Sequence, residues 1–357
     1  MTDTATPPSA RPSRAAKCLV WDLDQTLWRG TLLEGGGKEL APGVERIVHE
    51  LDQRGILQSV ASKNDHDTAW PRLEALAMAD YFLHPQICWD PKARSIKTIA
   101  ESLGIGLDSV AFIDDQPLER DEVAVLLPEV RVIDATELPT LLERPEFTPQ
   151  FVTHESHRRR SMYRADIERK AAEDHFEGTR DAFLATLNMR MKIRRARQDD
   201  LLRARELTIR TNQLNTSGRT YSYAELTEFA ASPDHLLLVA ELEDRYGSSG
   251  TIGLTLIDTA AQEWTIRLLI MSCRVLTRGV GTVLLGHILR RARRNEVRLR
   301  AIFVPTDRNK QMFVTYRFAG FRQLSEHAGS ILLEHELTRI AAHPTYIELS
   351  DEDEVFA

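Results

Sequence analysis

The first half of the fold is decided by the stretch Val20-Trp21-Asp22-Leu23-Asp24-Gln25-Thr26-Leu27-Trp28. The apolar run 18–21 predicts a buried parallel strand, and open α/β sheets bind ligands at the carboxyl ends of such strands. Asp22 and Asp24 follow at that end, and side chains two positions apart on extended backbone point the same way. Two carboxylates held this close repel each other unless a divalent cation or a shared proton lies between them. Their oxygens suit Mg²⁺, so the stretch predicts a magnesium site.

Further polar residues are predicted at successive strand ends. The apolar run 56–61 is followed by Ser62, and the run 110–113 is followed by Asp114 and Asp115. A helix predicted over 92–103 begins with Lys92. Converging carboxylates, a hydroxyl and a lysine suit phosphoryl chemistry, because a transferring phosphoryl group needs positive charge around its oxygens. A lone Asp-x-Asp-x-Thr would more simply be a helix cap and a surface turn. The four ordered elements favour a phosphoryl site over that alternative.

This set is similar, over roughly residues 17–140, to motifs I to IV of the haloacid dehalogenase (HAD) superfamily. The matching residues, in the order of the motifs, are Asp22/Asp24/Thr26, Ser62, Lys92 and Asp114/Asp115. The resemblance implies that Asp22 is the nucleophile or electrostatic centre and that Asp24 is the general acid/base. It implies Mg²⁺ held by Asp22, by Asp24 through its backbone carbonyl, and by Asp114. The phosphate-binding residues it implies are Thr26, Ser62 and Lys92.

The sequence leaves no room for a domain that would cover this site. Many HAD relatives carry such a cap after motif I or between motifs II and III. Here motif I is followed by a glycine-rich segment, residues 29–39, which predicts a hairpin flap, and then by a helix over 42–54. Between Ser62 and Lys92 only one helix and one short strand fit. An uncovered site is open to water and to a partner as large as a protein.

Length and composition predict a two-domain α/β enzyme. The 357 residues exceed the size at which one core usually stops growing, and 42% hydrophobic residues can fill two cores. The net charge of −7 argues against a general nucleic-acid binder, and no apolar run is long enough to suggest a membrane span. Three widely spaced cysteines suggest no disulfide framework, which is typical of a reducing cytoplasm.

The expected organisation has five parts. These are a disordered tail (1–16), a capless HAD-like domain with a Rossmann-like parallel sheet (17–145), a helical linker (146–184), a second, mixed α/β domain (185–346) and an acidic tail (347–357). The linker carries Arg158-Arg159-Arg160, which predicts either a solvated helix face or a docking patch for an acidic partner.

The second half has a different order of elements. Strands are predicted over 189–193, 235–240, 252–257, 264–271 and 298–304, and helices over 198–208, 223–231, 283–293 and 309–317. A turn containing Arg278, Gly279 and Gly281 precedes the third helix, where backbone N–H groups and the helix dipole can meet an anion.

This order is similar to the GNAT acyltransferase fold. The Arg/Gln-x-x-Gly-x-Gly/Ala motif of that family is met at Arg278 and Gly281 but departs at Val283, which counts against ordinary acetyl-CoA binding. Asn309, Tyr316 and Gly320-Phe321 stand where the family carries its closing Asn, Tyr and Gly-Phe. The resemblance implies a cleft for a pantetheine arm, formed by Arg278, Gly279, Gly281, Asn309 and Tyr316.

Over nearly the whole chain, the two halves together resemble the FkbH-like proteins of polyketide assembly lines. Beyond the two motif sets, the resemblance rests on segments 113–120, 210–216 and 271–275. It implies capture of a glyceryl unit from 1,3-bisphosphoglycerate, loss of phosphate, and transfer to the phosphopantetheine thiol of an acyl carrier protein. That product feeds methoxymalonyl-type extender units. Some members carry a cysteine between the motif I aspartates, where this chain has Leu23, so a motif I thiol cannot carry the acyl group here.

Cys273 is then the candidate covalent thiol, because it precedes the Arg278 turn and a thiolate attacks acyl phosphates well. The alternative is that Cys273 is a small buried hydrophobe, as Cys18 and Cys88 are expected to be, and that the carrier thiol attacks directly.

The polar cluster Asn212, Gln213 and Asn215 has two interpretations. The amides either cap a helix and hold a turn, or they donate hydrogen bonds to the glyceryl hydroxyls from the edge of an acceptor cleft.

The principal alternative function is a capless Mg²⁺-dependent HAD phosphatase acting on a phosphoprotein or a small phosphoester. In that case the second domain would only dock the substrate. A carrier-binding scaffold without catalysis is a third possibility, against which the presence of every motif residue argues.

Overall fold

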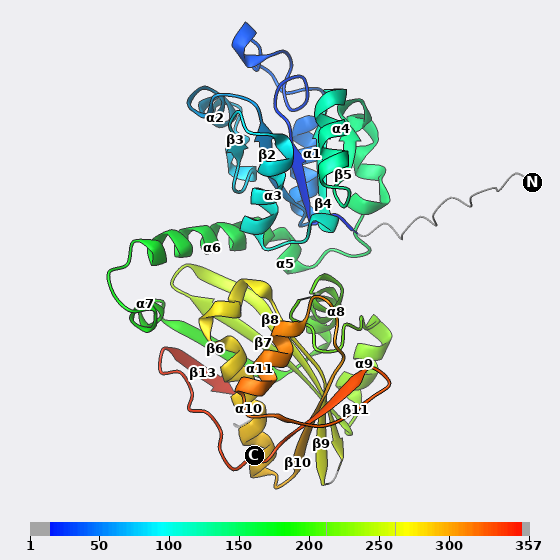
Figure 1. The fold of residues 1–357 in the computed structure, drawn as a ribbon, viewed down its shortest axis with the longest axis vertical. Helices are drawn as coiled ribbons and strands as arrows, with labels where there is room; N and C mark the ends of the chain where they lie inside the picture. Colours follow the sequence, from blue (N-terminus) through cyan, green and yellow to red (C-terminus); the bar gives the residue numbers. More distant parts are fainter. Residues whose placement is uncertain (1–14, 212, 261, 352–357) are drawn as a thin grey trace, which may run out of the picture. The chain divides into compact units, whose positions relative to one another are not determined.

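The chain folds into two compact units, each with its own sheet (Figure 1). The computed structural model describes residues 15–211, 213–260 and 262–351, so Asn212 and most of both expected tails lie outside the described residues. The units are Met1–Arg164 and Ala165–Ala357. The first has a parallel sheet and the second a mixed one, which confirms the expected fold class.

The first unit is a five-stranded parallel sheet with β1 at its centre, in the order β3-β2-β1-β4-β5. Its strands are β1 (Cys18–Trp21), β2 (Leu57–Ser62), β3 (Gln86–Ile87), β4 (Val110–Asp114) and β5 (Arg131–Asp134). Its main helices are α1 (Val44–Gln53), α2 (His66–Ala75), α3 (Lys92–Leu103) and α4 (Pro117–Leu126). Because β2 and β4 flank β1, the carboxyl ends of these three strands lie side by side.

Local sequence explains these elements. Helix α1 buries Val44, Ile47, Val48 and Leu51, whose spacing places them on one face, against the same core as Leu19 and Trp21 of β1. Helix α2 begins where the Asp65 side chain accepts a hydrogen bond from the Thr68 N–H. Helix α3 ends at Gly104, whose left-handed backbone suits glycine.

The glycine-rich segment folds back on itself as predicted, but as a loop with a 3₁₀ turn at Leu32–Glu34 and not as two extended strands. Its two arms are joined by the antiparallel bridge between Trp28 and Leu40 and by backbone bonds of Arg29, whose N–H donates to the Glu39 carbonyl at 3.0 Å and whose carbonyl accepts from the Gly37 N–H at 2.9 Å. The loop folds back so tightly that a Cβ at Gly36 would lie 2.6 Å from the backbone of Gly30 and Thr31. Close backbone approach therefore explains Gly36.

The arginines of the expected linker lie neither on a solvated face nor on a docking patch, except for the exposed Arg158. Helix α5 (His154–His157) leads into α6 (Arg159–Asp174). Arg159 is buried and donates to the Gly55 carbonyl at 2.7 Å. Arg160 donates to the Asp52 carboxylate at 2.9 Å and lies over the Tyr81 ring. Both side chains are engaged within the first unit, so the expectation was wrong for two of the three arginines.

The second unit is an eight-stranded mixed sheet in the order β11-β12-β10-β9-β8-β7-β6-β13. Its strands are β6 (Met189–Arg195), β7 (His235–Asp244), β8 (Gly247–Ala260), β9 (Glu263–Met271), β10 (Arg298–Phe303), β11 (Arg322–His327), β12 (Ser330–His335) and β13 (Ile347–Asp351). Its helices after α6 are α7 (Arg180–Thr186), α8 (Leu201–Arg210), α9 (Tyr223–Ala231), α10 (Val280–Arg294) and α11 (Lys310–Phe318). Residues 347–351, expected in an acidic tail, pair with β6 instead.

Two layers of helices cover this sheet. Alternate residues of β7 face opposite cores: Leu237 and Val239 pack with α8 and α9, whereas Leu236 and Leu238 pack with α10 and α11. The period-2 alternation thus supplies both cores from one strand.

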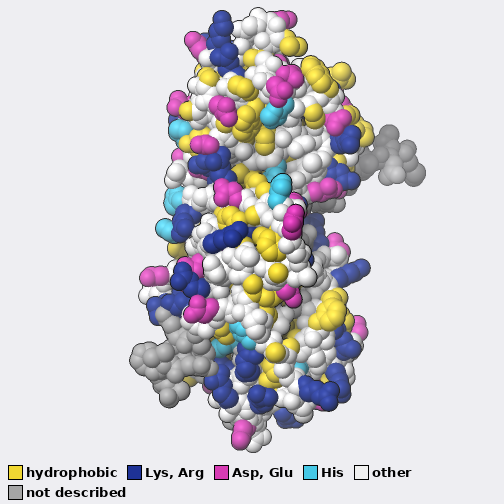
Figure 2. All heavy atoms as spheres, turned by 90° about the vertical axis from the view of Figure 1, so that its left-hand side faces the viewer, with side chains coloured by type: hydrophobic (Ala, Val, Ile, Leu, Met, Phe, Trp, Pro, Cys, Tyr) yellow, Lys and Arg dark blue, Asp and Glu magenta, His cyan; other side chains and the backbone are white. Residues whose placement is uncertain are grey.

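The surface is mixed in character. Large apolar side chains are exposed in both units, among them Leu118 and Val125 on α4 and Phe318 on α11. The face in Figure 2 shows hydrophobic side chains standing among charged ones. Scattered exposure of this kind is ordinary for a folded protein and needs no partner to explain it.

Candidate active site

Four residues predicted from the sequence converge in the first unit. The Lys92 ammonium donates to Oδ1 of Asp22 and, at 2.9 Å, to Oδ2 of Asp114. The Ser62 hydroxyl donates to the same Asp22 oxygen at 3.0 Å. All four side chains are buried, none more than 4% exposed.

The parallel sheet brings these residues together. Ser62 and Asp114 are the last residues of β2 and β4, and Asp22 directly follows β1. The Asp22 N–H donates to the Ile113 carbonyl at 3.0 Å, which continues the pairing of β1 with β4 by one residue. Lys92 is the first residue of α3, so the helix start delivers the ammonium to the carboxylates.

Burial and charge set the electrostatics of the cluster. Burial raises the pKa of Asp22 to about 7; Lys92 lowers it, and the nearby Asp114 raises it further. Burial alone would lower the pKa of Lys92, but the attraction of Asp22 and Asp114 outweighs it, so this pKa is raised. Burial and the Asp114 charge also raise the pKa of Asp115. The site therefore holds excess negative charge that a cation would relieve.

The acidic cluster fits a hard divalent cation. Carboxylate oxygens of Asp22, Asp114 and Asp115 lie within 4.8 Å of one another. An all-oxygen donor set of this charge is typical of Mg²⁺. Lys92 places one positive charge between Asp22 and Asp114, so three carboxylates share a single lysine.

The side chains of Asp24 and Thr26 lie beside the acidic cluster and are held by hydrogen bonds. The Asp24 carboxylate is outside the acidic cluster and accepts hydrogen bonds from the Trp28 indole N–H at 2.7 Å and the Leu32 N–H at 3.0 Å. Its side chain is thus engaged by the residues that lead into the glycine-rich segment. The Thr26 hydroxyl accepts from the Asp115 N–H at 3.0 Å, so it orients the motif IV turn.

Two further residues belong to this site. Asp115, which directly follows Asp114, adds a carboxylate that the sequence pattern does not mark as a metal ligand. Asn64 donates to Asp24 and Ser62 and is not predicted as a site residue. Its position two residues after Ser62 was the available signal, because alternate side chains leave a strand end on the same side.

Magnesium is expected to stabilise the protein more at high pH than at low pH. Because the pKa of Asp22 lies at about 7 in the folded protein against 3.8 in its ordinary state, the folded protein binds the extra proton between these values. Stability from this group therefore falls as the pH rises through that window. Mg²⁺ binds the ionised carboxylate, so its effect should be small at about pH 5.5 and large at about pH 8. Thermal unfolding with and without Mg²⁺ measures this; equal shifts at both pH values would contradict it.

In the second unit, the chain itself fills the gap between two strands. Strands β9 and β10 pair only over Glu263–Ile266 and Arg298–Ala301 and then part. The segment 214–216, here called the wedge, bonds to both: the Thr216 N–H donates to the Leu269 carbonyl at 3.1 Å, and the Thr216 carbonyl accepts from the Val304 N–H at 2.9 Å. The parted strand ends are therefore joined through the wedge.

Two residues expected at a ligand cleft, Asn309 and Asn215, have side chains that hydrogen-bond to backbone in and beside the wedge. The Asn309 amide donates to the carbonyls of Asn215 and Val304, each at 2.9 Å. The Asn215 side chain accepts from Ser217 and Gly218 N–H groups and donates to the Arg219 carbonyl, so its contacts match the turn-holding interpretation. Tyr316 is fully buried; burial raises the pKa of its hydroxyl, and Thr216 lowers it by less. Gln213 is exposed.

The Arg278 side chain does not face an open anion site. It is buried and pairs with Asp166 at 2.5 Å and with Asp244 at 3.4 Å. Arg169 pairs with the same two carboxylates. Burial lowers the pKa of Arg278 while these carboxylates raise it. The side chain is thus a structural cation, and an anion at this turn would have to use backbone N–H groups.

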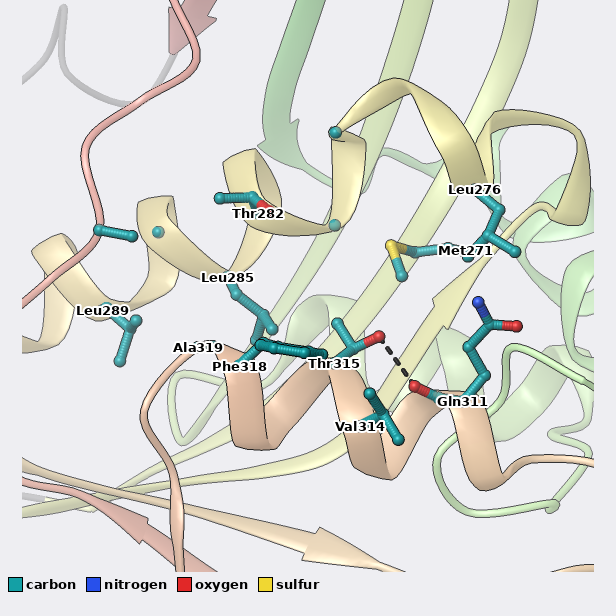
Figure 3. A pocket seen from close by; sticks show the side chains of 14 residues that line it. Met271, Leu276, Thr282, Leu285, Leu289, Gln311, Val314, Thr315, Phe318 and Ala319 are labelled. Atoms are coloured by element: carbon teal, nitrogen blue, oxygen red, sulfur yellow. Dashed lines mark hydrogen bonds between the residues drawn. The ribbon is translucent and has the colours of Figure 1, made fainter. Parts of the chain in front are cut away.

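A cavity of about 340 Å³ lies between α10 and α11 (Figure 3). Leu285 and Leu289 of α10 face Val314, Thr315 and Phe318 of α11 across it. Gly279 and Gly281 line its end, so two of the expected pantetheine residues do border a hollow. The lining is largely apolar, with the Gln311 amide and the Thr282 and Thr315 hydroxyls as its polar groups.

Cys273 lies close to this region in the sequence. It is exposed and begins the 3₁₀ turn Cys273–Arg278, which immediately precedes α10. Cys18 is fully buried in β1, and burial raises the pKa of its thiol. Cys273 is therefore the more accessible of these two thiols.

Filling the cavity at Gly281 should block binding there. Gly281 lies at the beginning of α10, and a Cβ at this position would already approach the Met271 side chain at 3.1 Å. Gly281→Trp should therefore abolish transfer to a pantetheine-bearing acceptor. Gln323→Trp is the control, because Gln323 lies on β11, whose residues are all exposed. Full acceptor loading by a folded Gly281→Trp variant would place the arm elsewhere.

Comparisons with known proteins give structural neighbours of two kinds. The N-terminal part of a Bacteroides fragilis protein, containing a phosphatase domain and complexed with Mg, is 30% identical over 36% of this chain and 40% of that chain, with a TM-score of 0.33. The GNAT domain of S. lividans PAT is 22% identical over 40% of this chain and 88% of that domain, with a TM-score of 0.32. The PaiA N-acetyltransferase from Thermoplasma acidophilum, in complex with coenzyme A, is 17% identical over 41% of this chain and 98% of that one, with a TM-score of 0.32.

Sequence comparisons add no family. A scan against models of protein families finds no match, and a search of curated proteins finds none. The solved structures similar to this chain nevertheless include both a phosphatase domain and acetyltransferase domains. No helix in the described ranges is long and apolar enough to cross a membrane.

Proposed function

We propose that this chain captures a glyceryl unit from 1,3-bisphosphoglycerate with loss of phosphate and transfers it to the phosphopantetheine thiol of an acyl carrier protein. The observation that carries the proposal is the buried Lys92 bridge between Asp22 and Asp114, with Ser62 on the same oxygen. These groups can bind a phosphate next to a bound cation. The sequence resemblance supplies the acceptor and the extender-unit context.

Magnesium is the cofactor we propose. Asp22, Asp114 and Asp115 would hold it, and the backbone carbonyl of Asp24 would be a further ligand. When bound, Mg²⁺ would neutralise charge on the phosphate oxygens. Lys92 and the Ser62 hydroxyl would complete the set of groups that hold the phosphate.

Acyl transfer makes one demand on the chemistry. A thiolate must attack the acyl carbon, so that the carbon–oxygen bond breaks and the C1 phosphate leaves with the bonding pair. If Asp22 attacked the phosphorus of the acyl phosphate instead, 3-phosphoglycerate would leave with the bridging oxygen and its activation would be lost. The thioester that forms still carries the 3-phosphate, which is removed by attack at its phosphorus, with water supplying the oxygen of the released phosphate, to leave a glyceryl group. In the proposed function Asp22 therefore acts as an electrostatic centre toward the acyl phosphate and as the nucleophile toward the 3-phosphate.

The experiment supplies 1,3-bisphosphoglycerate and a phosphopantetheinylated carrier protein, with intact-protein mass spectrometry as the readout. A mass increase of one glyceryl group on the carrier is expected, dependent on Mg²⁺ and the enzyme. Absence of loading while phosphate is released would contradict transfer and favour the alternative function.

The alternative is an Mg²⁺-dependent phosphatase, favoured by one observation: the phosphate-holding cluster is complete within the first unit, whereas the Arg278 and Asn309 side chains are engaged by the protein. Reaction in ¹⁸O-labelled water separates the two. Attack at phosphorus followed by hydrolysis puts ¹⁸O into phosphate, whereas attack at the acyl carbon leaves the C1 phosphate unlabelled, so transfer gives one unlabelled phosphate for each labelled phosphate from C3. Label in all of the phosphate released from the natural donor would therefore overturn the transfer proposal.

A covalent relay through Cys273 is testable with the donor alone. The Cys273 thiolate would bond to the acyl carbon as phosphate leaves, and the carrier thiolate would later displace Cys273 from the same carbon. The expected adduct is one 3-phosphoglyceryl group, or one glyceryl group after hydrolysis of the 3-phosphate, removable by hydroxylamine and absent in Cys273→Ser. Cys88→Ser, at a half-buried thiol, is the matched control. Carrier loading at the wild-type rate by Cys273→Ser would show direct transfer.

A further inference from the structure

A hydrogen-bonded chain links the glycine-rich segment to Asp22, and Asn64 is its central member. The Asn64 amide donates to Oδ2 of Asp24 at 3.2 Å and to the Ser62 oxygen at 3.1 Å. Asn64 is 2% exposed, so these bonds form away from bulk water. The amide nitrogen must face the carboxylate, because the amide oxygen in its place would repel it.

These hydrogen bonds run in one direction, from the Asn64 amide through the Ser62 hydroxyl to Asp22. Because the Ser62 oxygen accepts from Asn64, its own hydrogen is left to donate to Asp22 at 3.0 Å. On the other side, Oδ1 of Asp24 accepts from the Trp28 indole and from the Leu32 N–H. Asp24 is therefore clamped on both oxygens, by the loop on one and by Asn64 on the other.

The local turn does not need Asn64 for its own stability. The helix that follows β2 is capped by Asp65, which accepts from the Thr68 N–H at 3.0 Å. The Asn64 amide thus serves the two site residues and not the start of α2. A buried amide kept for such a purpose is a positioning group.

We propose that Asn64 is a positioning residue that sets the orientation of Asp24 and Ser62 together. It holds the Asp24 carboxylate toward the leaving oxygen and aims the Ser62 hydroxyl at Asp22. This inference rests on the proposed phosphate-handling site, and it holds for either transfer or hydrolysis there.

The test compares Asn64→Leu with Asp65→Ala, a neighbouring change that removes the cap of α2 and leaves the hydrogen bonds of Asn64 in place. The probes are 4-nitrophenyl phosphate and phenyl phosphate with Mg²⁺. A nitrophenolate leaves without protonation, whereas phenolate needs a proton donor. Asn64→Leu should lower kcat for phenyl phosphate by about 10²-fold and for the nitrophenyl ester by much less. The KM values should change little compared with kcat.

Equal losses on both probes, or the same pattern in Asp65→Ala, would overturn the proposal and leave Asn64 a structural residue. A second readout is independent of activity. The Trp28 indole N–H, bonded to Asp24 at 2.7 Å, should give a downfield NMR signal that Asn64→Leu shifts and Asp65→Ala does not. An unmoved signal in Asn64→Leu would contradict the clamp.

The two readouts distinguish a failure of the proposed function from a failure of the role proposed for Asn64. If the wild-type protein cleaves neither probe, phosphate handling at this site fails as a function. The indole signal then still decides whether Asn64 orients Asp24.

Discussion

Asp22→Asn is expected to reduce carrier loading by at least about 10³-fold. The asparagine keeps the shape of the side chain and removes the charge that Lys92 and the proposed Mg²⁺ share. The fold should survive, because Lys92 keeps its bond to Asp114 at 2.9 Å and because burial already disfavours the ionised form of Asp22. Intact-protein mass spectrometry of the carrier measures the loss.

The matched control is Asp67→Asn, a carboxylate on α2 whose side chain is 98% exposed. It should load the carrier at the wild-type rate. Undiminished loading by a folded Asp22→Asn variant, or by the wild type in excess chelator, would refute a metal-dependent site at Asp22.

Of these changes, Lys92→Met should lower the free energy of unfolding the most, and the size of this loss should depend on Mg²⁺. Removing the ammonium leaves two buried carboxylates facing each other, a loss of about 3–5 kcal/mol in the free energy of unfolding at about pH 8. The cost should shrink at about pH 5.5, because a protonated carboxyl no longer repels its neighbour. Denaturant unfolding at both pH values, with and without Mg²⁺, provides the measurement.

The control for this change is Lys63→Met, which breaks a pair with Glu119 whose lysine side chain is 35% exposed. Its cost should stay below about 1 kcal/mol. A Lys92→Met variant as stable as the wild type at high pH in chelator would show that the lysine is dispensable to the carboxylate pair.

Much of the first site could be predicted because short local stretches of sequence determine it. Apolar runs that end in Asp22, Ser62 and Asp114 become adjacent parallel strands, and the rules of such sheets then bring their ends together. The start of α3 at Lys92 followed from the change in residue pattern there. No long-range information was needed to place these four side chains near one another.

The misplaced residues depended on partners far away in the chain. Arg160 pairs with a carboxylate 108 positions earlier, and Arg278 pairs with one 112 positions earlier. Whether an arginine faces solvent, a phosphate or a carboxylate is decided by those partners, which a local pattern does not contain. Strand β11 escaped prediction for another reason: all its residues are exposed, so it lacks the alternation that marks a half-buried strand.

The wedge has a consequence for how an acceptor could be chosen. With Leu269 and Val304 already hydrogen-bonded to Thr216, an extended guest finds those main-chain groups taken. If the α10–α11 cavity takes the proposed acceptor, selection would then rest on side chains that line it, such as the exposed Val314 and Phe318. Main-chain pairing does not depend on the side chains of the guest, whereas exposed helix residues tolerate substitution at little cost in stability. A change of acceptor preference would therefore need substitutions on α11 alone and would leave the sheet beneath unchanged.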